Sequence, residues 1–286
     1  MTQKVTVIGA GTMGSGIAQI AAEAGFDVTI VDTDQKFIDR GIGTISKFLE
    51  RKASKGTISK EQMDASISRL KGTTDMKAGV DGAVMVVEAV FEKLELKKDI
   101  FTKLDSLCPK DVILASNTST LSITEIAGVT KNPERVIGTH YFSPVPLMKL
   151  VEVIRGEKTT DEVAEKTVSL CGQFGKKPIV VKDIPGFIVN RFLCLIYNEA
   201  ANMIENGAAS AEAIDQAMKL GCNWPMGPNE IMDLAGVDVC YFAIDAMYQM
   251  TGHEGYKPST LFKKMVDDNL LGRKTGRGFY SYEKKA

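Results

Sequence analysis

The feature that most constrains the fold is a glycine-rich turn near the start of the chain, formed by Gly9, Ala10, Gly11, Thr12, Met13 and Gly14. It directly follows a β-branched run at residues 5–8 and precedes a helix-like segment at residues 15–24. In such a strand–turn–helix unit Gly9 makes the tight turn, Gly11 lets a pyrophosphate approach the backbone, and Gly14 lets the helix pack closely. The pattern therefore predicts a dinucleotide-binding βαβ unit.

Asp32 completes this pattern, because it ends the next apolar run at residues 26–32. A carboxylate at this position accepts hydrogen bonds from a ribose 2′-hydroxyl and repels a 2′-phosphate, so we expect NAD rather than NADP as the cofactor. The alternative is a set of packing glycines and a strand-end aspartate that bind no ligand.

Short β-branched runs alternate with helix-like segments through the first half of the chain, at residues 5–8, 26–32, 82–88, 112–115, 136–139 and 150–154. This alternation is typical of a doubly wound parallel sheet. Residues 36–70 interrupt it with a long helical pattern that breaks at Lys55-Gly56, which predicts a helical hairpin insertion.

The pattern changes after the apolar run at residues 178–182, where Pro185-Gly186 breaks the chain. Helical segments follow at residues 187–206, 211–220, 228–250 and 259–269, and the glycine-rich stretch 272–278 reads as a loop. We therefore expect an α/β fold, with an N-terminal Rossmann-like NAD-binding domain at residues 1–182 and a smaller all-α domain at residues 183–286.

His140 and Glu152 are the first candidates for catalysis. His140 ends a strand and precedes a turn with two prolines, and Glu152 lies inside the next apolar strand. A buried carboxylate needs a partner, and one that accepts from an imidazole nitrogen fixes the tautomer and leaves the other nitrogen free as a base. The pair is a hypothesis; the alternative is a core histidine, with Glu152 capping a turn or meeting Lys149.

A basic stripe lies in the predicted hairpin, where Lys47, Arg51 and Lys55 follow one another at intervals of four residues on one helix face. It is either a solvated face or a binding surface for a phosphate-bearing substrate.

Two polar segments have open interpretations. The run from Ser116 to Thr120 stands at the carboxyl end of a predicted strand, where α/β sheets bind ligands, but it also suits a turn and helix cap. Asn190, in an otherwise apolar helix, either makes a structural hydrogen bond or reaches a substrate.

The composition sets limits on the function. With 286 residues, a net charge of −1 and 25% charged residues, nothing global attracts nucleic acid or an anionic membrane. The five cysteines are widely spaced without CxxC pairs, so we expect reduced thiols and no metal site. Met1 leads almost directly into the first strand, and no apolar run reaches membrane-spanning length, which predicts a cytoplasmic protein.

Six motifs in this order give the chain a specific resemblance: IGAGTMG, ASNTSTLSI, GTHYFSPVPLMKLVEVI, PGFIVNR, PMGP and LGRKTGRGFY. Over essentially its whole length the chain resembles the 3-hydroxyacyl-CoA dehydrogenase family, close to the short single-function 3-hydroxybutyryl-CoA dehydrogenases. The resemblance implies that His140 is the acid/base and that Glu152 orients it. It also implies roles for two further groups of residues: Ser119 and Asn190 at the reacting oxygen and the acyl-CoA carbonyl, and Asn117, Ser119, Glu92, Lys97 and Lys274 at NAD.

For the basic stripe, the resemblance implies that Arg51 and Lys55 meet the phosphates of CoA. The expected activity is NAD-dependent interconversion of a (3S)-3-hydroxyacyl-CoA, such as 3-hydroxybutyryl-CoA, and the 3-oxoacyl-CoA, in a homo-oligomer that is at least a dimer. Two alternatives remain: a dehydrogenase for a free hydroxy acid or sugar acid on the same scaffold, and an NAD-binding protein without catalysis.

Overall fold

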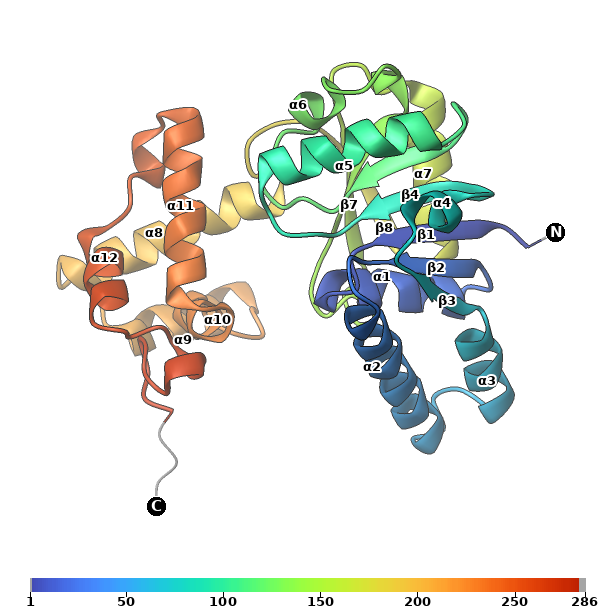
Figure 1. Cartoon of the computed structure of the whole chain (residues 1–286). Coiled ribbons are helices and arrows are strands. Elements are labelled where there is room, and N and C mark those ends of the chain that lie inside the picture. The colour runs from blue at the N-terminus through green and yellow to red at the C-terminus, as the bar shows by residue number, and fades with distance from the viewer. Residues whose placement is uncertain (1, 283–286) are drawn as a thin grey trace. The chain divides into compact units, whose positions relative to one another are not determined.

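The computed structural model describes residues 2–282, and the chain divides into two compact parts, Met1–Phe187 and Ile188–Ala286 (Figure 1). We call them the α/β unit and the helical unit. Asp183, where the sequence predicts the boundary, is bonded within the α/β unit, because its carboxylate accepts hydrogen bonds from Ser122 Oγ at 2.6 Å and from the Thr124 backbone N–H at 2.8 Å. Phe187 packs into a core of the same unit.

One eight-stranded sheet forms the centre of the α/β unit, in the order β3-β2-β1-β4-β5-β6-β7-β8. Its strands are β1 Lys4–Ile8, β2 Asp27–Val31, β3 Leu70–Thr73, β4 Ala83–Glu88, β5 Ile113–Ser116, β6 Val136–Tyr141, β7 Leu150–Arg155 and β8 Lys177–Lys182. The first six follow the strand order of a dinucleotide-binding sheet, which confirms the expected fold class. Neighbours pair parallel except β6 and β7, whose antiparallel pairing makes the sheet mixed.

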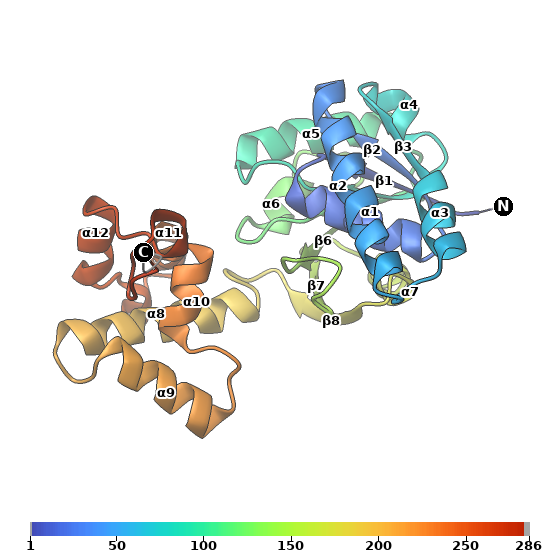
Figure 2. The same ribbon diagram turned by 90° about the horizontal axis from the view of Figure 1, so that it is seen from below.

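Helices cover both faces of this sheet (Figures 1 and 2). On one face lie α1 Thr12–Glu23, α2 Gln35–Ser54, α3 Lys60–Ser68 and α7 Asp161–Gln173, and on the other lie α4 Met76–Val80, α5 Leu94–Leu107 and α6 Ile123–Ala127. Successive residues of β4 show the division, since Met85 and Val87 pack into the first core and Val86 packs into the second. Strands buried on both faces explain why these runs are apolar throughout.

The predicted helical hairpin is present as α2 and α3, with one correction at its end. The Asp34 side chain caps α2, and Ser59 and Gln62 form a reciprocal capping box at the start of α3. Leu70, which the sequence predicts as the last hairpin residue, instead begins the edge strand β3. The sequence missed this strand because its four residues, Leu-Lys-Gly-Thr, have no apolar alternation.

The helical unit contains α8 Val189–Glu205, α9 Ala211–Cys222, α10 Pro228–Ala235, α11 Val237–Thr251 and α12 Thr260–Asp267. The short helices η2 Glu254–Tyr256 and η3 Arg273–Thr275 accompany them, and η1 Pro133–Arg135 lies in the α/β unit. The prediction of one helix over residues 228–250 was wrong. Gly236, with φ of 109°, separates α10 from α11, because this backbone conformation cannot continue a helix.

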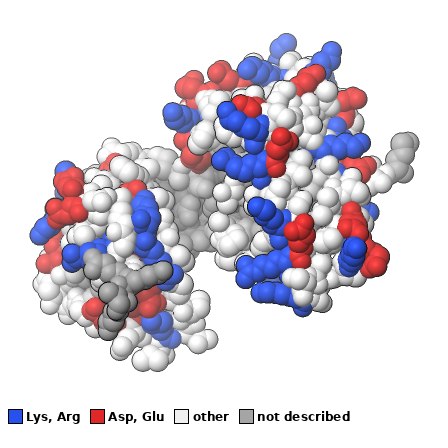
Figure 3. Space-filling model, turned by 60° about the horizontal axis from the view of Figure 1, so that its bottom comes forward, with Lys and Arg blue, Asp and Glu red and all other residues white. Residues whose placement is uncertain are grey.

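Positive and negative side chains are mixed over the face drawn in Figure 3, in keeping with the small net charge. Within residues 2–282, no helix combines the length and the apolar character that a bilayer crossing requires.

Candidate active site

The sheet register brings the ends of several strands to one edge. Ile8 of β1, Glu88 of β4 and Ser116 of β5 are successive register partners, and Ser116 in turn pairs with Gly138 of β6. The glycine turn after β1, the segment after β5 and His140 at the end of β6 therefore lie along the same carboxyl edge. This edge is where open α/β sheets bind their ligands.

His140 and Glu152 are direct partners in the antiparallel register of β6 and β7. His140 Nδ1 lies 2.7 Å from Glu152 Oε2, and both side chains are almost completely buried. The structure thus brings together the two residues that the sequence paired only as a hypothesis. The contact follows from the antiparallel pairing, because side chains directly opposite each other in the two strands project to the same face of the sheet.

Two aromatic rings contact the imidazole of His140. The ring of Phe142 is 4.5 Å from it and the ring of Phe187 is 5.7 Å from it, measured between ring centroids. Phe187 is buried and has a positive φ of 49°, an uncommon conformation for a bulky residue. These rings limit the directions in which the imidazole can move, and neither contact had a signal in the residue pattern.

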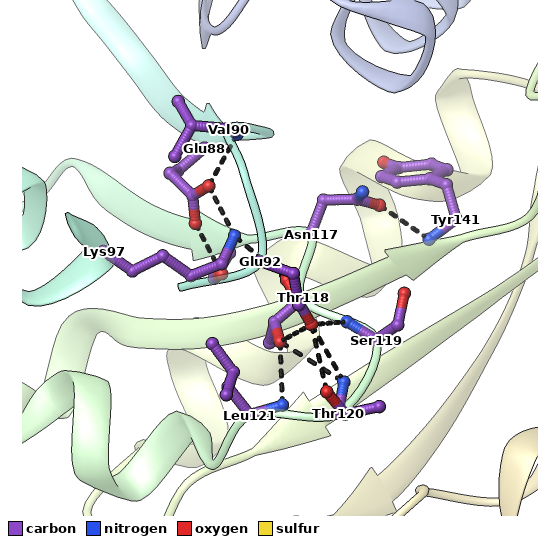
Figure 4. A network of polar contacts seen from close by, with 11 residues as sticks. Glu88, Val90, Glu92, Lys97, Asn117, Thr118, Ser119, Thr120, Leu121 and Tyr141 are labelled. Carbon is purple, nitrogen blue, oxygen red and sulfur yellow. Dashed lines mark hydrogen bonds and ion pairs between the residues drawn. The ribbon is translucent and has the colours of Figure 1, made fainter. Parts of the chain in front are cut away.

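The segment after β5 is tied to both neighbouring strands. The Asn117 backbone N–H donates to Glu88 O at 2.8 Å, and Asn117 Oδ1 accepts from the Tyr141 backbone N–H at 3.0 Å (Figure 4). Asn117 therefore links the turn that carries Ser119 to the residue directly after His140.

The glycine turn has the geometry expected for binding a pyrophosphate. Gly9 has φ of 106°, and a Cβ on Gly14 would lie 1.9 Å from Gly9 O, so no larger side chain fits at Gly14. A Cβ on Gly11 would meet nothing within 4 Å, which leaves open space above the backbone. Gly11 caps α1 without a side-chain hydrogen bond, and the first turn of α1 carries no acidic residue, so its N–H groups suit an anion.

Asp32 lies beside this turn. One carboxylate oxygen accepts from the Ala10 backbone N–H at 2.7 Å, and the other accepts from the Thr33 backbone N–H at 2.7 Å. Both contacts hold the carboxylate at the carboxyl end of β2, next to the residues that would receive the cofactor. The residues present therefore fit the dinucleotide that the sequence predicts.

The remaining predicted cofactor residues fall in two places. Glu92 and Lys97 lie in a hydrogen-bond network between β4, α5 and the Ser119 turn, which is buried at Lys97 and partly exposed at Glu92. Lys274 lies in η3 of the helical unit, where its Nζ pairs with Asp238 Oδ1 at 2.5 Å. Asn190 is in the first turn of α8 in the same unit.

The predicted basic stripe is exposed along α2. Lys47, Arg51 and Lys55 are solvent-exposed, whereas Ile45 and Leu49 on the opposite face are buried. Within residues 2–282 neither Arg51 nor Lys55 lies within 4.0 Å of a carboxylate oxygen, whereas their neighbour Lys52 pairs with Glu23. Both cations remain available to an anionic ligand.

Glu88 is the functional candidate that the sequence analysis missed. It is fully buried at the end of β4 and bonds to Lys97 and to Ser116. The sequence does indicate this residue, because Glu88 ends an apolar strand and a buried carboxylate needs a partner, which is the argument that identified Glu152.

Two further observations concern places away from this edge of the sheet. A groove of about 900 Å³ lies in the helical unit beside α11 and α12, with a lining that mixes acidic and basic side chains, and it contains none of the predicted site residues. Among residues 2–282 no cluster of three His, Cys, Asp or Glu side chains has the arrangement of a metal site.

Comparisons with known proteins agree over the whole chain. Residues 4–184 match the NAD binding domain of 3-hydroxyacyl-CoA dehydrogenase, and residues 186–282 match its C-terminal domain. A probable 3-hydroxybutyryl-CoA dehydrogenase of Deinococcus radiodurans is 45% identical over 98% of this chain and 100% of its own length. The 3-hydroxybutyryl-CoA dehydrogenase of Clostridioides difficile is 45% identical with the same coverage of both chains.

A solved structure supports the same assignment. The crystal structure of (S)-3-hydroxybutyryl-CoA dehydrogenase from Ralstonia eutropha superposes with a TM-score of 0.96 at 41% identity, and the match covers 99% of this chain and 100% of that one. With a dinucleotide-binding sheet, a helical second unit and near-full-length relatives of one kind, the chain belongs to the 3-hydroxyacyl-CoA dehydrogenase family and is an NAD-dependent oxidoreductase.

Proposed function

We propose that this protein interconverts a (3S)-3-hydroxyacyl-CoA and the corresponding 3-oxoacyl-CoA, with 3-hydroxybutyryl-CoA and acetoacetyl-CoA as the preferred pair. The observation that carries this proposal is the buried contact of 2.7 Å between His140 and Glu152 at the edge of the sheet that bears the glycine turn. The family membership of the chain and the names of its relatives support the substrate class.

In the oxidation, His140 acts as the general base. A carboxylate can only accept a hydrogen bond, so Glu152 Oε2 accepts from Nδ1–H and leaves Nε2 unprotonated. Nε2 takes the proton of the 3-hydroxyl while the carbon–oxygen bond becomes a carbonyl, and the negative charge of Glu152 stabilises the imidazolium that results. In the reduction, the same nitrogen returns the proton.

When bound, NAD would supply the nicotinamide ring that accepts the hydride from carbon 3. The open space above Gly11 and the N-terminus of α1 would hold the pyrophosphate, and Asp32 would accept from the 2′-hydroxyl of the adenosine ribose. This arrangement favours NAD over NADP. The other predicted cofactor contacts remain predictions: Asn117, Ser119, Glu92, Lys97 and Lys274.

The acyl-CoA contacts are proposed from the chemistry of four side chains. The exposed cations Arg51 and Lys55 suit the phosphates of CoA. The hydroxyl of Ser119 and the amide of Asn190 suit the reacting oxygen and the thioester carbonyl.

A double variant tests the basic stripe. If the stripe binds CoA, Arg51→Glu with Lys55→Glu raises the KM for the CoA thioester much more than the KM for a truncated thioester. Equal changes in both KM values would show that the basic stripe is a solvated face that does not bind CoA.

The decisive experiment measures the initial rate of cofactor oxidation with acetoacetyl-CoA, in parallel with NADH and NADPH, and with free acetoacetate as the control substrate. We expect rapid turnover confined to the thioester with NADH. Comparable turnover of free acetoacetate would reject the CoA substrate and favour a free hydroxy-acid dehydrogenase. Preference for NADPH would overturn only the role of Asp32.

A further inference from the structure

Glu88 is a buried carboxylate to which the proposed chemistry gives no role. It is fully shielded from solvent, and its Oε1 accepts from Lys97 Nζ at 2.6 Å and from the Val90 backbone N–H at 2.7 Å. Its Oε2 accepts from Ser116 Oγ at 2.7 Å. One side chain thus joins its own loop, α5 and the end of β5 (Figure 4).

Lys97 continues the network toward Glu92. The Lys97 side chain is only 1% exposed, and its Nζ lies 3.4 Å from Glu92 Oε2 in addition to its contact with Glu88. A buried ammonium group is stable only when it is paired, and the shorter of its two contacts, to Glu88, is the one that mainly holds Lys97.

Glu92 in turn clamps the turn that carries Ser119. Its Oε1 accepts from the backbone N–H of Ser119 at 2.7 Å and of Thr120 at 3.1 Å, and from Thr118 Oγ1 at 2.6 Å. Thr118 Oγ1 also accepts from the Leu121 backbone N–H at 2.9 Å. In Figure 4 the side chain of Ser119 points away from this clamp, so Glu92 holds the backbone and leaves the hydroxyl outside.

The electrostatics agree with this arrangement. Burial alone would raise the pKa of the Glu92 carboxyl, but the charge of Lys97 and the hydrogen bonds from Thr118, Ser119 and Thr120 outweigh it, so that the pKa is lowered. The carboxylate is therefore the form that the turn stabilises, and it is a pure hydrogen-bond acceptor, as the donors around it require.

From this geometry we infer that Glu88, Lys97 and Glu92 are positioning residues, which fix the turn bearing Ser119 and act on the reaction through it. The inference rests on the proposed role of Ser119 at the reacting oxygen. It gives Glu92 and Lys97 a role beside the NAD contact expected of them, because three residues of the turn donate to Glu92 Oε1 while Oε2 faces Lys97. Rate is sensitive to such positioning, since a displacement of about 1 Å can reduce it about 10²-fold.

A double-mutant cycle tests this inference in the full-length protein. Glu92→Ala, Ser119→Ala and the double variant are compared in kcat, in KM for acetoacetyl-CoA and in the Kd for NADH. We expect Glu92→Ala to lower kcat about 10²-fold when NADH is saturating. In the Ser119→Ala background the same change should lower kcat less than about threefold, because the hydroxyl that Glu92 positions is already absent there.

Glu92→Gln provides the conservative variant. All three residues of the turn donate to Oε1, which an amide oxygen can replace, so this variant should recover most of the kcat that Glu92→Ala loses. Independent, multiplicative losses in the cycle would overturn the inference.

Hydrogen exchange gives a readout that does not depend on activity. The amides of Ser119 and Thr120 should exchange faster in Glu92→Ala and retain their protection in Glu92→Gln. Unchanged protection in Glu92→Ala would overturn the inference even if the protein is an active dehydrogenase. Conversely, normal kcat in Ser119→Ala would reject the proposed role of Ser119, and the exchange rates would still decide whether Glu92 holds the turn.

Two control variants separate positioning from general stability. Glu95→Ala removes a carboxylate from α5, the helix that carries Lys97, but this side chain is 85% exposed and pairs at the surface with Lys98, so kcat and exchange should not change. Asp105→Asn weakens the buried ion pair with Arg135 at the other end of α5 and should lower stability while leaving kcat intact. Glu88→Ala removes the acceptor of Lys97, Val90 and Ser116, so it should follow Glu92→Ala in kcat. A loss of stability with normal kcat would remove Glu88 from the positioning set.

Discussion

At the residue scale, the contact between His140 and Glu152 depends on one feature, the register of β6 and β7. The two residues are opposite each other in this register, and a shift of one residue would turn Glu152 to the other face of the sheet. The proposed catalytic pair is therefore held by main-chain hydrogen bonds of the two strands, and Phe142 and Phe187 add side-chain contacts to the imidazole.

The first prediction concerns His140 itself. His140→Gln should lower kcat by about 10²- to 10⁴-fold, the usual contribution of a general acid/base, because glutamine cannot take the proton from the 3-hydroxyl. The Kd for NADH, measured by fluorescence titration, should stay near the value of the unchanged protein. Glu152→Gln should also lower kcat, because a neutral amide cannot stabilise the imidazolium.

The chain offers a matched control, since it contains only two histidines. His253 is exposed in the helical unit, where its Nδ1 accepts from the Gly255 backbone N–H, so His253→Gln should leave kcat unchanged. If His140→Gln retained full turnover, the general base would have to be another group and the proposed mechanism would be rejected.

The sequence predicted some of these residues and missed others for a physical reason. His140 and Glu152 were recognisable because a proline-rich turn separates two short apolar strands, and His140 ends the first while Glu152 is the one carboxylate in the second. Glu88 and Lys97 were harder to recognise as partners, because they lie on different elements and meet only once α5 packs on the sheet. Local spacing predicts contacts between adjacent strands better than contacts between a strand and a helix.

At the element scale, the order of strands and helices was predictable, and the exceptions are local. The antiparallel pairing of β6 with β7 was not predictable, because the residue pattern of a strand does not depend on its direction in the sheet. The break between α10 and α11 depends on Gly236, where the apolar periodicity of the two helices runs on without interruption in the sequence. A single glycine inside a helical pattern is a weak signal for an end.

The second prediction compares two glycines of α2 that lie two residues apart. A Cβ on Gly41 would lie 2.9 Å from Ser15 Oγ and 3.0 Å from Ala10 O, whereas a Cβ on Gly43 would meet nothing within 4 Å. Gly43→Ala should therefore stabilise the protein by roughly 0.5–1 kcal/mol through helix propensity. Gly41→Ala should destabilise it by about 1–3 kcal/mol through overpacking.

Urea unfolding of both variants measures these free energies, and an NADH titration adds a functional readout. Gly41 packs against the glycine turn, so Gly41→Ala should also weaken NADH binding, whereas Gly43→Ala should not. Equal stability of the two variants would show that α2 can move away from the turn without cost, and the close approach would then not be a constraint on the cofactor site.

At the scale of the whole molecule, α11 has apolar residues on two faces. Val237, Cys240, Ile244 and Met247 face the core of the helical unit. Val239, Phe242, Ala246 and Met250 follow the same helical spacing on another face, where Val239, Phe242 and Met250 are 53%, 61% and 44% exposed. A helix that is apolar on both faces is expected to be covered on both.

The third prediction is that a second copy of the chain covers this outer face of α11, in line with the homodimer expected from the family resemblance. Sedimentation equilibrium should give twice the mass of one chain. Phe242→Glu places a charge in the apolar face and should shift the protein toward the monomer. Ile179→Glu is the matched control, because Ile179 is a similarly exposed apolar residue of β8 in the α/β unit, at 49%. A monomeric unchanged protein would reject the dimer, and an unchanged mass for Phe242→Glu would place the interface on another surface.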